Sequence, residues 1–335
     1  MLTNVLLFAL GFVLLIIGGD KFVDGATGVA KRYHIPELLI GATVVSIGTT
    51  LPEVMVSATS AAKGIGDIAY GNAIGSIICN TSLIAALTVA IRPAPVGKKD
   101  LIKPVIFFFT AAIIYAGVSY MTGYFSRFTG IILLLIFVVY MVMIVKDALK
   151  GNASGTDSSP KAETTEGETK KSVASGFKES ILYDLLMIVI GAVFITIGAN
   201  LLVDNGTIIA TALGVPTSVI ALTFVALGTS LPELVTAITS LIKGHGALSL
   251  GNVIGANLFN LVLVSGLSIA IQPFHIPVEK TIAGMNASLV VDIPVMFGVM
   301  IILTIPSIIR GKLSRIQGIL LLAIYAAYIV FQFML

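Results

Sequence analysis

A polar stretch inside an otherwise apolar segment constrains this chain more than any other feature. Residues Ser46–Val54 read SIGTTLPEV, and residues Ala226–Leu234 read ALGTSLPEL 180 positions later. Glu53 and Glu233 therefore stand at equivalent positions. An ionised carboxylate at bilayer depth costs roughly 2.5–3.5 kcal/mol on insertion scales, so two of them predict a bound cation rather than a packing role.

Pro52 explains how a membrane-spanning helix can present further ligands here. It has no N–H and its ring clashes with the preceding turn, which releases the carbonyl groups of Gly48 and Thr49 from helical hydrogen bonding. Broken helices in both halves of a transporter point to its substrate site. A kink that only shapes the helix is the alternative, but a kink does not require a glutamate.

The composition places these motifs in a polytopic membrane protein. Of the 335 residues, 57% are hydrophobic and 11% are charged, and the mean hydropathy is +1.05. This excludes a soluble fold, and the net charge of +3 is too small to imply a nucleic-acid partner. No protein partner is evident. Apolar runs of roughly 17–25 residues predict ten spans. They lie at about 3–30, 38–62, 67–91, 104–121, 128–148, 181–211, 217–242, 247–271, 287–308 and 314–334.

The two halves repeat without a gap. At an offset of 180 positions, Asn, Pro, Glu and Lys residues match in register, which chance similarity between apolar sequences would not produce. Because five spans is an odd number, two copies of one fold must enter the membrane from opposite sides. We therefore predict an all-α polytopic membrane protein with ten transmembrane helices in two inverted five-helix repeats, over residues 1–150 and 180–335. The Ser-, Thr-, Gly-, Lys- and Glu-rich residues 151–179 are expected to form a flexible linker.

The basic residues predict the orientation. With the N-terminus outside, most loop lysines and arginines fall on the inner side, and the outer side holds only Lys63, Arg127 and Lys280. We therefore expect a multi-pass protein of the cell membrane, with both termini outside and the 151–179 linker in the cytoplasm.

A second polar stripe follows each glutamate. Asn72, Ser76 and Asn80 are four positions apart and share one helix face. Hydrogen bonding between helices is the alternative to ion binding and stays open for Asn72 and its counterpart. The deeper Asn80 and its counterpart are favoured as ligands. The equivalent residues of the second half are Asn252, Ala256 and Asn260.

Carboxylates, amide oxygens, hydroxyls and freed carbonyls form an all-oxygen ligand set without Cys or His. Such ligands suit hard cations and Ca²⁺ above all, since Ca²⁺ accepts about 6–8 flexible oxygen ligands whereas Mg²⁺ loses its water reluctantly. Two carboxylates balance one divalent ion or two monovalent ions, which suggests competition for a shared site. No cofactor is expected, because the ions are cargo.

At this point a family resemblance is clear. GTTLPE followed by GNAIGSIICN, and GTSLPE followed by GNVIGANLFN, resemble the alpha-1 and alpha-2 repeats of the cation/calcium exchanger superfamily, nearest to the prokaryotic sodium/calcium exchangers. The resemblance implies an antiporter and not an enzyme. It would exchange Ca²⁺ for Na⁺ across the lipid bilayer, with alternating access produced by the first and sixth helices sliding past a core of the second, third, seventh and eighth. A Ca²⁺/H⁺ antiporter of the same superfamily is the main alternative.

The resemblance also implies a set of ligands. Calcium would be bound by the carboxylates of Glu53 and Glu233 and by the carbonyls of Thr49 and Thr229, with Asn80 and Asn260 in the centre. Sodium ligands would be the carbonyls of Ser46 and Ala226, and the side chains of Thr50, Ser230 and Ser76.

Two positions depart from the family pattern. Ala256 stands where many members have Ser, so one sodium site lacks a hydroxyl ligand. Asn260 replaces an Asp that is often found there, which argues against the potassium-dependent branch.

Two other classes fit the sequence less well. A channel does not explain an inverted duplication around a midplane site. An intramembrane hydrolase would use the two carboxylates as acid and base, but the chain has no Ser or Cys with a His at a matching buried position.

Overall fold

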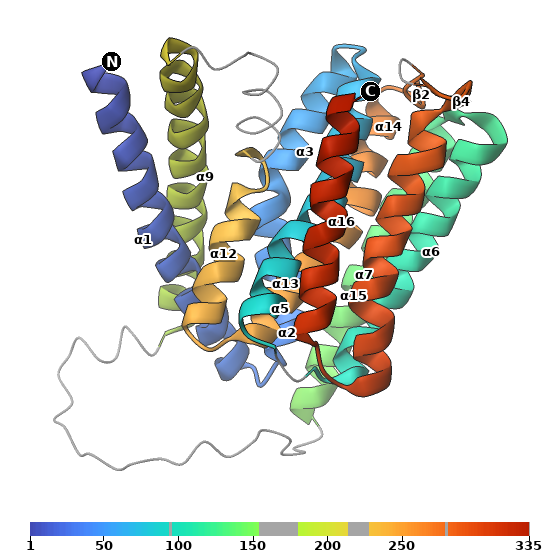
Figure 1. The fold of residues 1–335 in the computed structure, drawn as a ribbon. Coiled ribbons are helices and arrows are strands. Elements are labelled where there is room, and N and C mark those ends of the chain that lie inside the picture. The colour runs from blue at the N-terminus through green and yellow to red at the C-terminus, as the bar shows by residue number, and fades with distance from the viewer. Residues whose placement is uncertain (94–95, 154–179, 214–227, 279–280, 335) are drawn as a thin grey trace, which may run out of the picture.

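The computed structural model describes residues 1–93, 96–153, 180–213, 228–278 and 281–334 (Figure 1). Within these residues, nine helical segments are long and apolar enough to cross a membrane. The remaining predicted span, 217–242, is described only from residue 228 and contributes the short apolar helix α12 (Leu231–Ile242).

The first half contains five spans, three of them built from a single helix. These are α1 (Leu2–Arg32), α6 (Lys98–Thr122) and α7 (Arg127–Ala153). The second span joins α2 (Glu37–Ile40), the π-helical turn η1 (Gly41–Val45) and α3 (Ser46–Ala62). The third joins α4 (Gly66–Cys79), the π-helical turn η2 (Asn80–Ala85) and α5 (Ala86–Ile91).

The second half repeats this order. Its elements are α9 (Ile181–Ala212), α12, α13 (Gly246–Phe259), η4 (Asn260–Ser265), α14 (Gly266–Ile271), η5 (Ser288–Asp292), α15 (Ile293–Arg310) and α16 (Arg315–Met334). Two short antiparallel strand pairs lie in the loops. One joins β1 (Tyr124–Phe125) to β2 (Phe274–His275), and the other joins β3 (Thr281–Ile282) to β4 (Met285–Asn286).

Figure 1 shows the two ends of the bundle. The N- and C-termini lie at the upper end, which we call the terminal end. α7 ends and α9 begins at the lower end, which we call the linker end. α1 and α9 run side by side in opposite directions, as equivalent helices of inverted repeats do. α7 ends at Ala153, so the first residues of the predicted linker are helical, and residues 154–179 lie outside the described part.

α1 and α9 form a unit beside the rest of the bundle. They pack through small residues, since an added Cβ would lie 2.8 Å from the Gly198 carbonyl at Gly11 and 2.9 Å from the Gly191 carbonyl at Gly18. At the linker end, Arg32 of α1 donates to the Asp184 carboxylate of α9 at 2.9 Å. The buried side chains of these two helices belong to a smaller hydrophobic cluster than the one that fills the main bundle.

The prediction that Pro52 breaks its helix is wrong for the first half. α3 continues through Pro52 as one α-helix, and the irregular turn, η1, ends before Ser46. The second half matches the prediction better, because α12 starts only at Leu231 with Pro232 in its first turn. Proline is well tolerated in that place, since the first turn leaves N–H groups unpaired in any case.

Candidate cation-binding site

The two glutamates of the repeated motif meet inside the bundle. Glu53 on α3 and Glu233 on α12 are both fully buried. Thr50, which lies one turn before Glu53 on α3, donates a hydrogen bond to Glu233, so the two carboxylates lie in the same region of the bundle. Neither forms an ion pair with a Lys, Arg or His among the described residues. Two buried negative charges without a protein cation require a cation or protons from solution.

Hydrogen bonds serve the two carboxylates unequally. Thr50 Oγ1 donates to Glu233 Oε1 at 3.5 Å. Glu233 Oε2 and both carboxylate oxygens of Glu53 have no hydrogen-bond partner within the described residues. Three carboxylate oxygens are therefore free to bind a cation.

Asn80 and Asn260 are the first residues of the π-helical turns η2 and η4. Both are fully buried, and neither side-chain amide has a hydrogen-bond partner within the described residues. Leaving a buried polar group unpaired costs about 1–3 kcal/mol, so ions or water are expected to satisfy these amides. The π-helical turns, which often mark functional sites, were not predicted from the sequence. Their signal in the sequence is only that an Asn recurs at both positions.

Asn72 connects the two repeats. Its Nδ2 donates to Ser57 Oγ at 2.8 Å and to the Glu53 carbonyl at 3.3 Å. Its Oδ1 accepts a hydrogen bond from Thr229 Oγ1 at 3.4 Å. Asn72 thus ties the helix that carries Glu53 to the motif of the other half.

Asn252 makes the reciprocal connection. Its Oδ1 accepts from Thr49 Oγ1 at 3.2 Å and its backbone carbonyl accepts from Ser46 Oγ at 3.0 Å. Its Nδ2 has no hydrogen-bond partner among the described residues, and Ala237 stands where the first half has Ser57. For both asparagines the structure shows the hydrogen-bonding role between helices that the sequence left open.

Four predicted site residues remain, together with Ala256, the position that departs from the family pattern. Ser46, Ser76 and Ser230 are buried in the same region, on α3, on α4 and directly before α12. Ala256 is fully buried and offers no hydroxyl. Ala226 lies outside the described residues.

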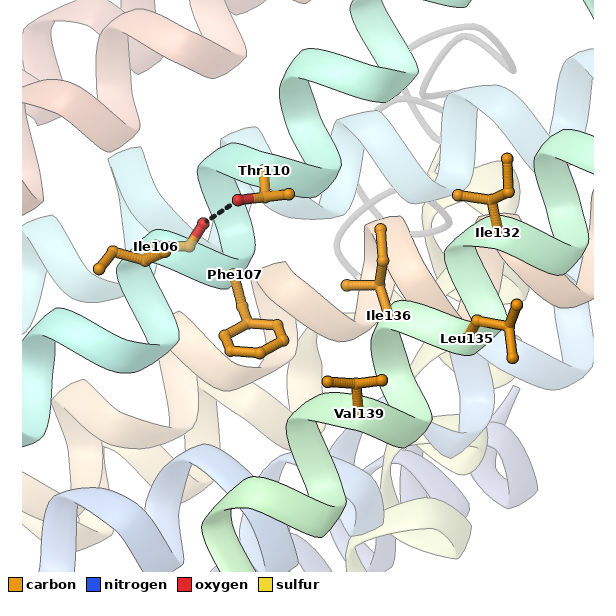
Figure 2. A pocket seen from close by; sticks show the side chains of 7 residues that line it. All are labelled: Ile106, Phe107, Thr110, Ile132, Leu135, Ile136 and Val139. Atoms are coloured by element: carbon orange, nitrogen blue, oxygen red, sulfur yellow. Dashed lines mark hydrogen bonds between the residues drawn. The ribbon is translucent and has the colours of Figure 1, made fainter.

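A pocket of about 330 Å³ lies elsewhere, between α6 and α7 (Figure 2). Its only hydroxyl, that of Thr110, already donates to the Ile106 carbonyl at 2.8 Å. This pocket suits a lipid acyl chain and not an ion. Its lining residues are Ile106, Phe107, Thr110, Ile132, Leu135, Ile136 and Val139.

The described residues contain no cluster of three or more His, Cys, Asp or Glu side chains. The ligands around the glutamate pair are instead amides and hydroxyls, a set that suits hard cations and not zinc or copper. Two halves that contribute equivalent carboxylates to one buried site define a membrane transporter of the exchanger, or antiporter, class.

Comparison with known proteins specifies this class. The family model described as sodium/calcium exchanger protein matches residues 3–146 and 183–334. The chain therefore belongs to the sodium/calcium exchanger protein family, whose members are transporters. This confirms the expected superfamily and the multi-pass membrane character.

Individual relatives cover nearly the whole chain. An uncharacterized membrane protein of Methanocaldococcus jannaschii is 34% identical over 95% of this chain and 94% of its own length. The sodium/calcium exchanger MaX1 of Methanosarcina acetivorans is 31% identical over 98% of both chains. A structure of the sodium-calcium exchanger NCX_Mj, soaked with Na⁺ and Sr²⁺, superposes with a TM-score of 0.76 at 31% identity over 98% of both chains. The match confirms the predicted fold of ten helices in two inverted repeats.

Proposed function

We propose that this protein is a secondary antiporter that exchanges Ca²⁺ for Na⁺ by alternating access at the site around Glu53 and Glu233. One observation carries the proposal. Each repeat contributes one fully buried carboxylate, and no cationic side chain of the described residues neutralises either. The cargo must supply the positive charge.

The charge of the site supports exchange between these two ions. One Ca²⁺ or two Na⁺ would neutralise the pair, so each ion displaces the other. Two opposite unit charges 4 Å apart attract by about 4 kcal/mol at an effective dielectric constant of 20, several times more than in water. The site therefore favours ion-bound states, which suits an antiporter that changes between its two access states only with ions bound.

The proposed ligands follow the sequence predictions. Calcium binds the carboxylates of Glu53 and Glu233 and the carbonyls of Thr49 and Thr229, with the unpaired amides of Asn80 and Asn260 in the centre. Sodium binds the carbonyls of Ser46 and Ala226 and the side chains of Thr50, Ser230 and Ser76.

The relatives support these cargo ions. MaX1 is named a sodium/calcium exchanger, and NCX_Mj has been soaked with Na⁺ together with Ca²⁺ or Sr²⁺. The identity of about 31% over nearly the whole length of both proteins makes a shared cargo the simplest assumption.

We also propose that the protein resides in the cell membrane with both termini outside and the 151–179 linker in the cytoplasm. The basic-residue bias supports this orientation. Cysteines introduced as Ser158→Cys and Ser172→Cys should react with an impermeant reagent only from the inside. Reaction from outside in sealed, right-side-out cells would contradict it.

The test of function is calcium uptake by proteoliposomes that contain purified protein. An outward Na⁺ gradient should drive uptake of radioactive Ca²⁺, and an outward H⁺ gradient without Na⁺ should not. Uptake driven by the H⁺ gradient alone would favour the Ca²⁺/H⁺ antiporter instead. If neither gradient drives uptake, the protein exchanges Ca²⁺ for neither Na⁺ nor H⁺, and the proposal is refuted.

A further inference from the structure

An ion-pair cluster joins α1 to the end of α12. Lys243, the residue that follows α12, places its Nζ 2.6 Å from Asp20 Oδ1 and 2.6 Å from Asp24 Oδ1, and donates to the Asp20 carbonyl at 2.9 Å. The Lys243 side chain is only 22% exposed. One lysine thus holds two successive turns of α1 at the linker end.

The helices are tightly packed beside this cluster. An added Cβ at Gly19 of α1 would lie 2.7 Å from Val235 Cγ1 and 2.8 Å from Thr239 Oγ1 of α12. In Figure 1 the lower parts of α1 and α12 approach each other toward the linker end, and this contact and the Lys243 cluster join the two helices there.

The inverted repeat supplies an equivalent set at the terminal end. The counterparts, 180 positions away, are Lys63 after α3 and Asp204 and Asn200 on α9. All three are exposed, and neither Lys63 nor Asp204 forms an ion pair with another described residue. Among the described residues, these ion pairs are therefore formed at the linker end and not at the terminal end.

We propose that Lys243, Asp20 and Asp24 are positioning residues of the transport cycle, which hold the linker end closed, and that Lys63 and Asp204 pair to hold the terminal end closed in the alternate state. This inference rests on the proposed function, exchange by alternating access. When the two repeats exchange conformations, the molecule becomes its own inverted image and opens at the opposite end. The α1 and α9 unit then releases Lys243 as it brings Asp204 to Lys63.

The two sets differ in the number of carboxylates that face the lysine, which predicts a bias, although Asp20 also lies 3.9 Å from Lys21. Asn200 stands where the linker-end cluster has Asp20, so Lys63 gains one carboxylate where Lys243 has two. The state closed at the linker end is therefore favoured in the absence of ions. A ligand-free equilibrium of this kind responds to any change in the contacts that only one state makes.

Thiol labelling of full-length protein in proteoliposomes tests the proposal. In a background with Cys79→Ser, Thr239→Cys reports access to the linker end and Thr59→Cys reports access to the terminal end. Lys243→Ala should speed labelling of Thr239→Cys and slow that of Thr59→Cys by about three- to tenfold, the range expected for partly exposed ion pairs in a network. Unchanged labelling at both positions would overturn the proposal.

We call the closure of each end by its lysine and carboxylates the lock. Matched variants distinguish loss of the lock from a general loss of packing. Lys243→Arg should restore the native labelling rates. Lys63→Ala should slow labelling of Thr239→Cys, and Asn200→Asp, which adds the missing carboxylate, should speed it. If Lys243→Ala does not fold, the milder Asp24→Asn must shift labelling in the same direction. An effect of the same sign from Lys63→Ala and Lys243→Ala would refute the symmetric lock.

Failure of the lock and failure of the proposed function give different results. Labelling is measured without Ca²⁺ or Na⁺ gradients and reports only which end is open. Wild-type exchange with unchanged labelling in Lys243→Ala refutes the lock alone. If Lys243→Ala shifts the labelling but the wild-type protein does not exchange Ca²⁺ for Na⁺, the lock is supported and the proposed cargo is refuted.

Discussion

The two halves of the site present their equivalent glutamates in different ways. Glu53 lies within α3, which continues through Pro52, and no described residue donates a hydrogen bond to its carboxylate. Glu233 lies in the first turn of α12, where the free N–H groups of a helix start favour negative charge, and Thr50 donates to it.

The difference shows that both repeats keep the carboxylate but not the same hydrogen-bond donors around it. Glu233 is partly compensated by a hydrogen bond from Thr50 and by the helix start, whereas no described side chain donates to the Glu53 carboxylate. The hydroxyl groups differ in the same way, because Ser57 and Ser76 of the first half correspond to Ala237 and Ala256 of the second.

The largest expected effect comes from the carboxylates themselves. Glu53→Gln and Glu233→Gln should each reduce calcium exchange by at least about 100-fold, because half of the charge that balances a divalent ion is lost where charge interactions are strong. Uptake by proteoliposomes measures this. Asp67→Asn, which removes an exposed carboxylate at the start of α4, is the control and should keep exchange.

Stability of the same two variants sharpens the comparison between the halves. Without ions, Glu53→Gln should raise the thermal unfolding midpoint more than Glu233→Gln does, since a neutral amide is cheaper to bury and no described side chain donates to the Glu53 carboxylate. Equal midpoints would mean that the helix start and Thr50 give Glu233 no advantage.

A smaller effect concerns sodium. Ala256 cannot provide the hydroxyl that Ser76 provides, so Ala256→Ser should lower the Na⁺ concentration for half-maximal exchange by about threefold, in line with one added ligand of hydrogen-bond strength. Ser76→Ala should raise it. Steep Na⁺ cooperativity and strong voltage dependence in the wild type, unchanged by Ala256→Ser, would show that water or backbone replaces the missing hydroxyl.

The smallest effect concerns Asn252, whose Nδ2 has no hydrogen-bond partner among the described residues. Ala237→Ser gives Asn252 Nδ2 the acceptor that Ser57 gives Asn72, and should stabilise the protein by about 0.5–1.5 kcal/mol. Ser57→Ala should destabilise it by about 0.5–1.5 kcal/mol, since it removes the closer of two acceptors from the partly buried Asn72 amide. Thermal unfolding in detergent compares the two, and a loss of stability in both variants would mean that position 237 has no room for the hydroxyl.

The sequence predicts the parts of this account that depend on composition and repetition. Apolar runs define the spans, and an odd number of spans per repeat dictates the inversion. A glutamate in such a run cannot be explained by packing, so Glu53 and Glu233 identify the region of the site directly.

Features that depend on packing between distant segments were not predictable in this way. Pro52 favours a break, but α3 stays helical and the irregular turn is displaced to Gly41–Val45, because neighbouring helices and not local propensity decide where the backbone yields. The π-helical turns at Asn80 and Asn260 have no local signature. The bond from Thr49 to Asn252 requires the two repeats to interlock, which no spacing within one repeat reveals.

Calcium binding to the purified wild type in the presence of increasing Na⁺ tests the central claim most directly, namely that both ions share the site around Glu53 and Glu233. Isothermal titration should show that Na⁺ raises the apparent Kd for Ca²⁺ without lowering the number of Ca²⁺ ions bound at saturation. Both binding and competition should be lost in Glu53→Gln. A Kd that does not change with Na⁺, or calcium binding that survives in Glu53→Gln and Glu233→Gln, would contradict a shared site.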